Sequence, residues 1–421
     1  MQEFYYKNNE LWCEDLNLKD LAERFGTPLY AYSKHSITDH CRHIERALSD
    51  IDHLTCYAVK ANANRAILGV IAKEGLGADI GSIGEMHLAL EAGFPHQKIT
   101  YSGVGKRDDE IEFALENDIM ALNVESEEEI QVVNQISARL GRRANILLRV
   151  NFDIGTETHP YITTGRKYNK FGVSCARVKE ILCRARELDG IEALGIHSHL
   201  GSQIVESEKF AMAAEAITNL VTELRAEGIP VSQVNVGGGF GVQYHDYVAH
   251  ELLPSDGSPK EKGLTTVGLL EAVLPILEKM GCKILIQPGR SIVAHSGILI
   301  TKVLYRKETD GKTFVIVDAG MSDFLRPSLY QSYHQIVPLK LLNTNHEIVD
   351  VVGPLCESGD FFAHDRTLPM VERGYLIAIM CTGAYGYVLS SNYNGRPRPA
   401  EVMVDGAQAY LIRSRETLGQ L

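Results

Sequence analysis

The sequence predicts an α/β protein in which a TIM-like (β/α)8 barrel is combined with a second, all-β domain of sandwich-like or barrel-like form. Three observations lead to this fold class. Short apolar segments alternate eight times with longer amphipathic segments between residues 54 and 287, which is typical of a parallel sheet with crossover helices. The segments after residue 290 are short and β-rich, and 421 residues exceed what one hydrophobic core usually contains.

The eight apolar segments are the predicted barrel strands. They are residues 54–60, 77–80, 99–102, 119–124, 145–150, 193–199, 234–236 and 282–287. The segments between them have helical periodicity; in 130–140, for example, apolar residues recur on one helical face. We expect the sheet to close into a barrel, with an open doubly wound sheet as the alternative topology.

The second domain is predicted from short β-rich runs that Gly, Pro and Asn separate, without a long helical pattern. These runs are 298–305, 313–318, 347–352, 375–380, 400–404 and 408–413. A strand-like run at 28–32 has no place in a barrel that begins near Leu54, so we assign it to the β domain. The predicted boundaries are 36–290 for the barrel, and 1–35 with 291–421 for the β domain.

Composition excludes several functional classes. The net charge is −12, from 42 basic and 54 acidic residues, which argues against a nucleic-acid partner. No apolar stretch approaches membrane-spanning length, so we expect no membrane association. The eight cysteines are scattered without Cys-x-x-Cys or zinc spacing, which indicates reduced thiols and a cytoplasmic location.

Lys60 closes the first apolar segment in the run 57–62, YAVKAN. If the strand end is buried, desolvation lowers the pKa of the ammonium and frees the amine as a nucleophile, as Schiff-base formation with an aldehyde cofactor requires. The structural alternative is a lysine that extends its ammonium to solvent from a strand end.

Polar residues end or follow five of the eight predicted strands, at the end of the barrel where active sites form. They are Lys60, Asp79, Ser82, Glu85, Arg149, Asn151, His197, His199, Ser202, Gln203, Gln287 and Arg290. Three consecutive glycines, 237–239, follow the seventh strand and let backbone N–H groups converge on an anion. This position favours a phosphate site to which Ser202 adds a hydroxyl, although a plain turn has the same composition.

The run His197-Ser198-His199 does not predict a metal centre, because no third ligand with suitable spacing is near. We expect no metal. His199 is a candidate for packing against a flat cofactor, whereas His197 is interpreted as a hydrogen-bonded core histidine.

The β domain contributes three further clusters. Arg326 and Tyr330 lie in one, Cys356 and Glu357 in another, and Tyr385 in a Gly-rich turn. Arg290 and Arg326 are suited to hold a substrate carboxylate through paired hydrogen bonds. Each cluster is also compatible with a solvated loop.

Taken together, the motifs resemble the pyridoxal-phosphate decarboxylases of the alanine-racemase fold type, and among them the diaminopimelate decarboxylase family. The likeness runs almost end to end. The motifs that carry it are 57–62 (YAVKAN), 164–165 with 170–172 (TG and KFG), 197–203 (HSHLGSQ), 237–241 (GGGFG), 288–290 (PGR), 326–330 (RPSLY), 356–360 (CESGD) and 383–385 (GAY).

The resemblance implies decarboxylation of meso-2,6-diaminopimelate to L-lysine and CO2, the last step of lysine biosynthesis. The implied catalytic residues are Lys60, which would carry the cofactor, His199, which would stack on its ring, and Cys356, which would donate a proton. The implied cofactor site is Lys60, Asp79, His199, Ser202, Gly237, Gly238, Gly239, Gln287, Gly289, Arg290 and Tyr385. The implied substrate site is Arg290, Arg326, Tyr330, Glu357 and Tyr385.

In this family Cys356 and Glu357 would come from a neighbouring subunit, so the resemblance also implies a homodimer with shared active sites. One position departs from the family pattern: Gln287 stands before Pro-Gly-Arg, where a glutamate is usual. A neutral amide gives up the charge-assisted part of a hydrogen bond, about 1 kcal/mol. Either the enzyme works with a less protonated cofactor ring, or another acid compensates.

Three alternative functions remain open at this stage. Lys60, His199 and the glycines would serve an ornithine or arginine decarboxylase equally well, although such an enzyme tends to have an acidic residue near Arg326. An amino-acid racemase of the same fold is favoured by Gln287 and disfavoured by the Cys356 cluster. A catalytically silent relative that binds a partner would usually lack Lys60 or the phosphate loop.

Overall fold

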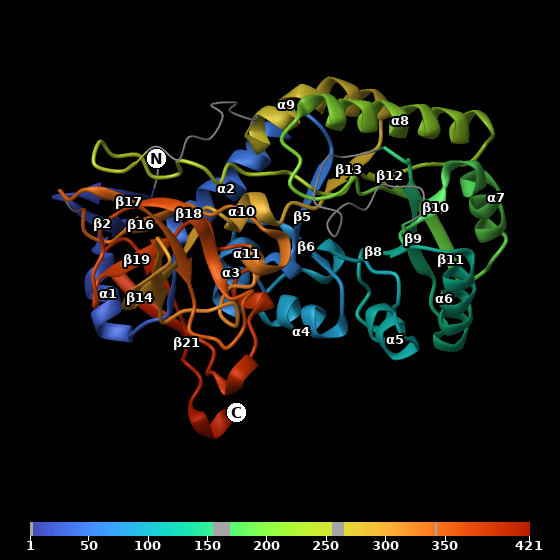
Figure 1. The fold of residues 1–421 in the computed structure, drawn as a ribbon. Coiled ribbons are helices and arrows are strands. Elements are labelled where there is room, and N and C mark those ends of the chain that lie inside the picture. The colour runs from blue at the N-terminus through green and yellow to red at the C-terminus, as the bar shows by residue number, and fades with distance from the viewer. Residues whose placement is uncertain (1–2, 155–168, 255–264, 342) are drawn as a thin grey trace. The chain divides into compact units, whose positions relative to one another are not determined.

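The computed structural model describes residues 3–154, 169–254, 265–341 and 343–421. The chain divides into two compact units, whose elements are labelled in Figure 1. The β unit comprises Met1–Asp39, Gln243–Lys262 and Ile292–Leu421, and the barrel unit comprises His40–Val242 and Gly263–Ser291. The sequence had placed all of 36–290 in the barrel, whereas 36–39 and 243–254 belong to the β unit.

The barrel unit contains eight parallel strands in a closed ring. Their order is β5-β6-β7-β8-β9-β11-β12-β13, and the pairs β13–β5 and β8–β9 complete the ring. Closure excludes the open doubly wound sheet. The strands are β5 (His53–Ala58), β6 (Gly77–Ile80), β7 (Ile99–Tyr101), β8 (Ala121–Val124), β9 (Ala144–Asn151), β11 (Ile191–His197), β12 (Gln233–Asn235) and β13 (Lys283–Ile286). A two-residue strand, β10 (Val173–Ser174), pairs with the end of β9.

A helix follows each of the first seven barrel strands, as the alternating pattern predicts. These helices are α3 (Arg65–Lys73), α4 (Ile83–Glu91), α5 (Asp108–Glu116), α6 (Glu127–Leu140), α7 (Cys175–Arg186), α8 (Ser207–Ala226) and α9 (Thr266–Leu277). Asn64, Ser82 and Ser126 cap α3, α4 and α6, because each side chain accepts a hydrogen bond from a first-turn N–H group. These N-caps fix where the helices begin, shortly after the strand ends at which the polar side chains collect.

The β unit is built on a mixed sheet with the strand order β18-β17-β15-β14-β4-β20-β21. The strands are β4 (Leu29–Ser33), β14 (Gly297–Thr309), β15 (Lys312–Val317), β17 (His346–Val352), β18 (Phe361–Pro369), β20 (Ala400–Asp405) and β21 (Gln408–Arg413). β19 (Leu376–Ile379) pairs with β14 and with β16 (Ile336–Pro338). The N-terminal strand β4 pairs with β14 on one side and β20 on the other.

The remaining elements flank these two sheets. A small antiparallel sheet contains β1 (Phe4–Lys7), β2 (Glu10–Cys13) and β3 (Leu16–Asn17). The remaining α-helices of the described chain are α1 (Leu18–Phe25), α2 (Lys34–Ala47), α10 (Arg290–Val293) and α11 (Arg326–Tyr330). Within the described residues, no helix combines the length and the apolar character needed to cross a lipid bilayer.

Candidate active site

Lys60 lies just beyond the first barrel strand rather than in it. β5 ends at Ala58, and Lys60 occupies a 3-10 turn, Val59–Ala61. The side chain is exposed, so the expectation that strand burial desolvates its ammonium is wrong. The charge of Lys60 nevertheless acts on its neighbours, since it opposes the rise that burial causes in the pKa of Asp79 and adds to the fall that burial causes in the pKa of His199. Lys60, Asp79 and His199 therefore face one region at the carboxyl ends of the strands.

Asp79 is the centre of a buried hydrogen-bond network. Its Oδ1 accepts from Ser102 Oγ at 2.6 Å and from Thr100 Oγ1 at 3.1 Å. Burial raises the pKa of Asp79, while the nearby Lys60 ammonium opposes that shift. The network holds one acidic side chain, 5% exposed, in a fixed orientation.

Gln287 joins this network to His197. Its Nε2 donates to Asp79 Oδ1 at 2.7 Å and its Oε1 lies 3.2 Å from His197 Nε2. The NH2 group of the Gln287 amide therefore faces Asp79, because a carboxylate can only accept a hydrogen bond. His197 is 1% exposed and burial, followed by the charge of Arg149, holds its pKa well below the usual range. A neutral imidazole with its proton on Nε2 fits this arrangement, as expected of a core histidine.

His199 is fixed from the backbone of the glycine loop. Gly238 N donates to His199 Nδ1 at 3.0 Å, which leaves the ring proton on Nε2. Desolvation, followed by Lys60 and Arg149, holds the pKa of His199 well below its usual range. The imidazole is thus a neutral, oriented ring beside the glycines.

The glycines at 237–239 allow backbone contacts that no side chain permits. A Cβ at Gly238 would collide with Gln287 O, and a Cβ at Gly239 would meet Gly201 O at 2.5 Å. Gly239 also has φ +98°, a conformation that side chains rarely adopt. The loop therefore packs directly against His199 and against the segment that leads to Ser202.

Ser202 and Arg290 meet at the same end of the barrel. Arg290 Nη2 donates to Ser202 Oγ at 2.9 Å, and Arg290 is only 5% exposed. Gly289 precedes the arginine, and a Cβ there would lie 3.0 Å from that of Ala61, next to Lys60. The guanidinium, the hydroxyl and the Lys60 turn are thereby brought together.

A buried ion-pair layer supports the fifth strand, and sequence reasoning missed three of its four residues. Arg149 Nη1 pairs with Glu125 Oε1 at 2.6 Å, and Gly172 N donates to the other oxygen of Glu125 at 2.7 Å. Lys106, whose side chain is 1% exposed, donates to Glu129 Oε1 at 2.7 Å. Arg149 was a sequence candidate, whereas Glu125, Lys106 and Glu129 carry no local motif.

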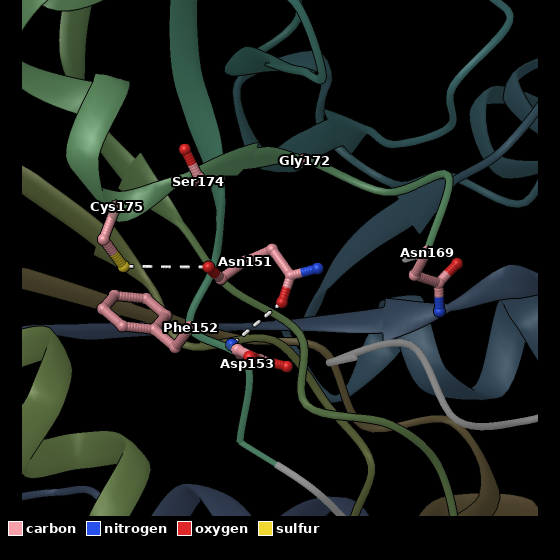
Figure 2. Close-up of a pocket in the computed structure, with 7 residues that line it drawn as sticks. All are labelled: Asn151, Phe152, Asp153, Asn169, Gly172, Ser174 and Cys175. Carbon is pink, nitrogen blue, oxygen red and sulfur yellow. Dashed lines mark hydrogen bonds between the residues drawn. The ribbon is translucent and has the colours of Figure 1, made fainter. Parts of the chain in front are cut away.

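A pocket of about 290 Å³ opens beside the end of β9 (Figure 2). Its lining residues are Asn151, Phe152, Asp153, Asn169, Gly172, Ser174 and Cys175. Asn151 shapes the pocket, because its Oδ1 accepts from Asp153 N at 3.0 Å and its carbonyl accepts a weak bond from Cys175 Sγ at 3.7 Å. The TG motif at 164–165 lies outside the described residues.

In the β unit, Arg326 opens helix α11 and Tyr330 ends it. The guanidinium carbon lies 5.5 Å from the ring centroid of Tyr244 and 5.6 Å from that of Tyr330. Arg326 Nε lies 3.3 Å from His334 Nε2. Arg326 is 5% exposed, so these aromatic neighbours fix both its position and its desolvation. Tyr244 and His334 were not singled out in the sequence, because neither belongs to a recognisable motif.

Cys356 and Glu357 occupy an exposed loop that one buried carboxylate organises. Asp360 accepts from Leu355 N at 2.7 Å and from Met321 N at 2.6 Å, and it is 4% exposed. Glu357 Oε2 accepts from Tyr393 Oη at 2.9 Å. The thiol and the carboxylate are therefore presented to solvent on a braced loop.

Tyr385 lies in a tight turn of the same unit with φ +55°, and it is partly exposed. Gly383, two residues earlier, packs so closely that a Cβ there would collide with Val293 O. The turn is therefore determined by backbone packing, and it presents the Tyr385 side chain at a fixed point of the β unit.

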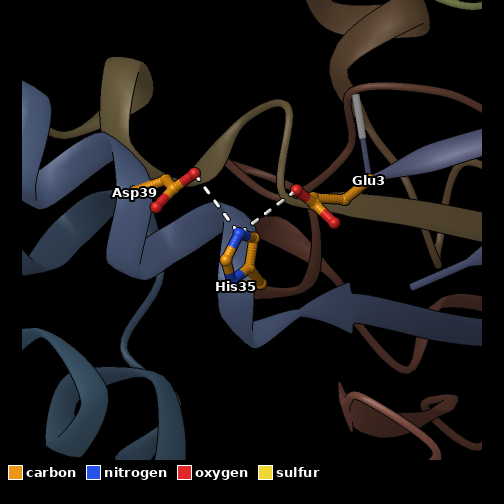
Figure 3. Close-up of side chains that lie close together, drawn as sticks. All are labelled: Glu3, His35 and Asp39. Atoms are coloured by element: carbon orange, nitrogen blue, oxygen red, sulfur yellow. Dashed lines mark ion pairs between the residues drawn. The ribbon is translucent and has the colours of Figure 1, made fainter. Parts of the chain in front are cut away.

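A second acidic and imidazole group lies in the β unit, separate from these motifs (Figure 3). His35 Nε2 is 3.6 Å from Glu3 Oε1 and 3.4 Å from Asp39 Oδ2. The cluster is thus a single imidazole that lies at ion-pair distance from two carboxylates.

The barrel residues fit the three parts of pyridoxal phosphate. Lys60 offers an exposed amine to the aldehyde. Arg290, Ser202 and the close-packed glycines offer cationic, hydroxyl and backbone groups of the kind that bind phosphate. His199 offers a neutral ring to a flat face, and the Asp79–Gln287 pair offers a buried polar edge.

Comparison with known proteins agrees with this donor set. A model of the pyridoxal-dependent decarboxylase family, pyridoxal binding domain, matches residues 34–294. Diaminopimelate decarboxylase of Aquifex aeolicus is 41% identical over 98% of this chain and 94% of its own length. That of Pseudomonas aeruginosa is 43% identical over 100% of this chain and 98% of its own. The crystal structure of diaminopimelate decarboxylase from Helicobacter pylori complexed with L-lysine superposes with a TM-score of 0.89, at 40% identity over 96% of this chain and 98% of that chain.

The chain therefore belongs to the pyridoxal-dependent decarboxylases and, within that class, to the diaminopimelate decarboxylase family. The fold agrees with the class and with the family, because it superposes on that of the Helicobacter pylori enzyme. The closed parallel barrel and the separate β unit also confirm the fold class predicted from the sequence.

Proposed function

We propose that the protein is a carboxy-lyase that converts meso-2,6-diaminopimelate to L-lysine and CO2, the last step of lysine biosynthesis. The observation that carries this proposal is the 41–43% identity to diaminopimelate decarboxylases over nearly the whole chain, in both units. The L-lysine in the Helicobacter pylori complex supports the assignment of the product.

Pyridoxal phosphate, when bound, supplies an electron sink for the pair of electrons that loss of CO2 leaves on the α-carbon. In our assignment, Lys60 is the amine that binds the cofactor covalently. Ser202, Gly237, Gly238, Gly239, Gly289, Arg290 and Tyr385 hold its phosphate. The close packing of the glycines and the Arg290–Ser202 hydrogen bond support this assignment.

His199 covers one face of the cofactor ring, and its neutral state supports this role because a neutral imidazole adds no positive charge beside the sink. Asp79 and Gln287 contact the polar edge of the ring. The 2.7 Å bond between them supports the reading in which another acid, Asp79, compensates for the missing glutamate. The barrel unit, which covers most of the predicted range 36–290, would then be the pyridoxal-phosphate domain.

The substrate carries an amino-acid group at each end, so two carboxylates and two amines need partners. We assign Arg290, Arg326, Tyr330 and Tyr385 to substrate binding, with Glu357 as the partner of the ammonium-bearing end. Arg326 provides a desolvated guanidinium whose charge is undiminished by burial, because arginine stays protonated.

Cys356 is assigned as the proton donor that replaces CO2. Cys356 and Glu357 are both exposed on their loop, which suits residues that complete the active site of a partner subunit. We therefore propose a homodimer with shared active sites. The eight cysteines are all unpaired with one another, which suits a cytoplasmic enzyme.

The test is amine release by purified protein with pyridoxal phosphate, offered meso-diaminopimelate, ornithine and arginine in parallel. Lysine formed from diaminopimelate alone supports the proposal. Turnover of ornithine or arginine instead contradicts the substrate assignment and leaves the cofactor assignment standing. Silence on all three substrates, combined with solvent-hydrogen exchange at an amino-acid α-carbon, favours the racemase alternative.

A further inference from the structure

We infer that His334 is a positioning residue for substrate binding, because it sets the orientation of the Arg326 guanidinium that receives a substrate carboxylate. The inference rests on the proposed function, in which Arg326 binds that carboxylate. It concerns contacts within the β unit alone.

The first step is the hydrogen bond between the two side chains. Arg326 Nε lies 3.3 Å from His334 Nε2. A guanidinium nitrogen only donates, so Nε2 is the acceptor. His334 Nδ1 lies 2.9 Å from Met380 O, and a carbonyl only accepts, so the ring proton is on Nδ1. One neutral tautomer satisfies both bonds, and the imidazole links the arginine to the backbone at the end of β19.

The second step is that the His334 ring has little freedom. The ring is 0% exposed. Tyr244 and Phe324 pack edge-on against it, each with a centroid separation of 4.7 Å, at interplanar angles of 65° and 84°. The backbone is held as well, since His334 O accepts from Arg366 Nη1 at 2.8 Å. A ring fixed on all these sides is a rigid acceptor.

The third step is geometric. The guanidinium group of Arg326 is planar. An acceptor that fixes Nε therefore also fixes the plane in which the two terminal nitrogens lie. The ring centroids of Tyr244 and Tyr330 lie 5.5 and 5.6 Å from the carbon of that guanidinium. Paired hydrogen bonds to a carboxylate depend on this plane, because the two N–H vectors must be parallel to the two oxygens. His334 therefore acts on carboxylate affinity without itself contacting the substrate.

Two substitutions separate this role from a structural one. In His334→Gln the longer amide brings Oε1 within reach of Arg326 Nε and restores the acceptor. In His334→Asn the shorter amide retains a donor for Met380 O but does not reach the arginine. Both variants bury a similar polar group, so a difference between them reports the bond to Arg326. His364→Asn is the matched control, since His364 is exposed on β18 and its Nδ1 pairs with Asp350.

The experiment measures binding to the cofactor-loaded enzyme by calorimetry, with L-lysine and with cadaverine, which is lysine without its carboxylate. We expect His334→Asn to weaken lysine binding about tenfold and cadaverine binding by less than twofold, because only lysine needs the oriented arginine. The KM for diaminopimelate should rise about tenfold with kcat changed by less than threefold. His334→Gln and His364→Asn should remain within threefold of the unmodified enzyme in every value.

Equal losses for lysine and cadaverine in His334→Asn would overturn the inference, because they indicate general damage to the site. Unchanged lysine binding in His334→Asn would overturn it as well. An unmodified enzyme that binds no lysine and does not decarboxylate diaminopimelate contradicts the proposed function first, and the inference with it.

Discussion

Gln287 donates a hydrogen bond from Nε2 to Asp79 Oδ1 at 2.7 Å, deep in the carboxyl end of the barrel. The same amide contacts His197 through Oε1. An amide at position 287 thus connects a buried acid to a buried neutral imidazole. A carboxylate at that position could not donate to Asp79, so the residue at 287 and the charge of Asp79 are coupled.

This coupling gives the first prediction, for Gln287→Glu. Two carboxyl groups at hydrogen-bond distance share one proton, so the pKa of the new pair is raised above that of the unfolded chain. A raised carboxyl pKa stabilises the fold at low pH and loses that stabilisation as pH rises. We expect the variant to be less stable than the parent by about 1–3 kcal/mol at pH 8, with a smaller difference at pH 5. Denaturant unfolding at both pH values measures this.

The same variant should change kcat more than it changes affinity for pyridoxal phosphate, because we assign the Asp79–Gln287 pair to the polar edge of the ring alone. Asp79→Asn combined with Gln287→Glu restores one donor and one acid, and should remove the pH-dependent loss of stability. If Gln287→Glu alone lost cofactor affinity while kcat stayed unchanged, that result would contradict our placement of the Asp79–Gln287 pair.

The second prediction concerns Lys60. Because the side chain is exposed, Lys60→Arg and Lys60→Met should alter the free energy of unfolding by about 0.5 kcal/mol or less. Both should abolish the visible absorbance of covalently bound cofactor and reduce diaminopimelate turnover by about three orders of magnitude or more. The arginine variant keeps the charge and removes the reactive amine, so it separates the two properties. Lys73→Met, at an exposed position in α3, is the control and should retain full absorbance.

The third prediction concerns Gly239→Ala. The new Cβ would meet Gly201 O at 2.5 Å, in addition to the strain of φ +98°. We expect the dissociation constant of pyridoxal phosphate, measured by fluorescence titration, to rise at least about tenfold, because the phosphate loop must shift. Gly75→Ala isolates the strain, since Gly75 has φ +87° and open space around it. Cofactor affinity that falls equally in both variants would argue against a phosphate site at Gly239.

The fourth prediction is a pH dependence in the β unit. Burial raises the pKa of Asp323 to about 7, whereas an unfolded aspartate titrates near pH 4. The folded chain therefore binds this proton more tightly. Its contribution is present below pH 4 and is lost as pH rises to about 7, on the order of 4 kcal/mol in total.

Asp323→Asn removes this titration and still lets a side-chain oxygen accept from Gly320 N, the bond that Asp323 makes at 2.8 Å. Urea unfolding at pH 5 and pH 8 should show a smaller difference in this variant than in the parent. The control Asp310→Asn, at an exposed turn between β14 and β15, should keep the parental pH dependence. An unchanged slope in Asp323→Asn would show that another group is responsible.

The sequence predicted the barrel well because each strand is a compact apolar run and each helix has clear periodicity; Ile130, Val133 and Ile136 are all buried on α6 as expected. β18 was missed because His364, Asp365 and Arg366 interrupt its apolar pattern. Asp365 has φ +46°, and the register with β17 shifts nearby. An irregular strand of this kind lacks the regular alternation of apolar and polar residues by which a strand is recognised in a sequence.

The candidate site could be proposed from the sequence where a residue lies at or just after a strand end, as for Asp79 and His199. It was not predictable where a side chain acts through a distant partner. Lys106 reaches Glu129 across two elements, and His334 reaches Arg326 from beyond the end of α11. The exposure of Lys60 also depends on where β5 ends, which differs from the apolar run by only two residues.

The central position of β4 has a consequence for synthesis of the protein. All five residues of β4 are buried, and its neighbours β14 and β20 begin at Gly297 and Ala400. At roughly 5–20 residues per second, a ribosome would take about 20–70 s to reach β20 after completing β4. Until β14 is made the nascent strand has two unpaired edges, and from then until β20 is made it has one, while the barrel can already form. A chain truncated before residue 400 would keep one of those edges open to association with other molecules.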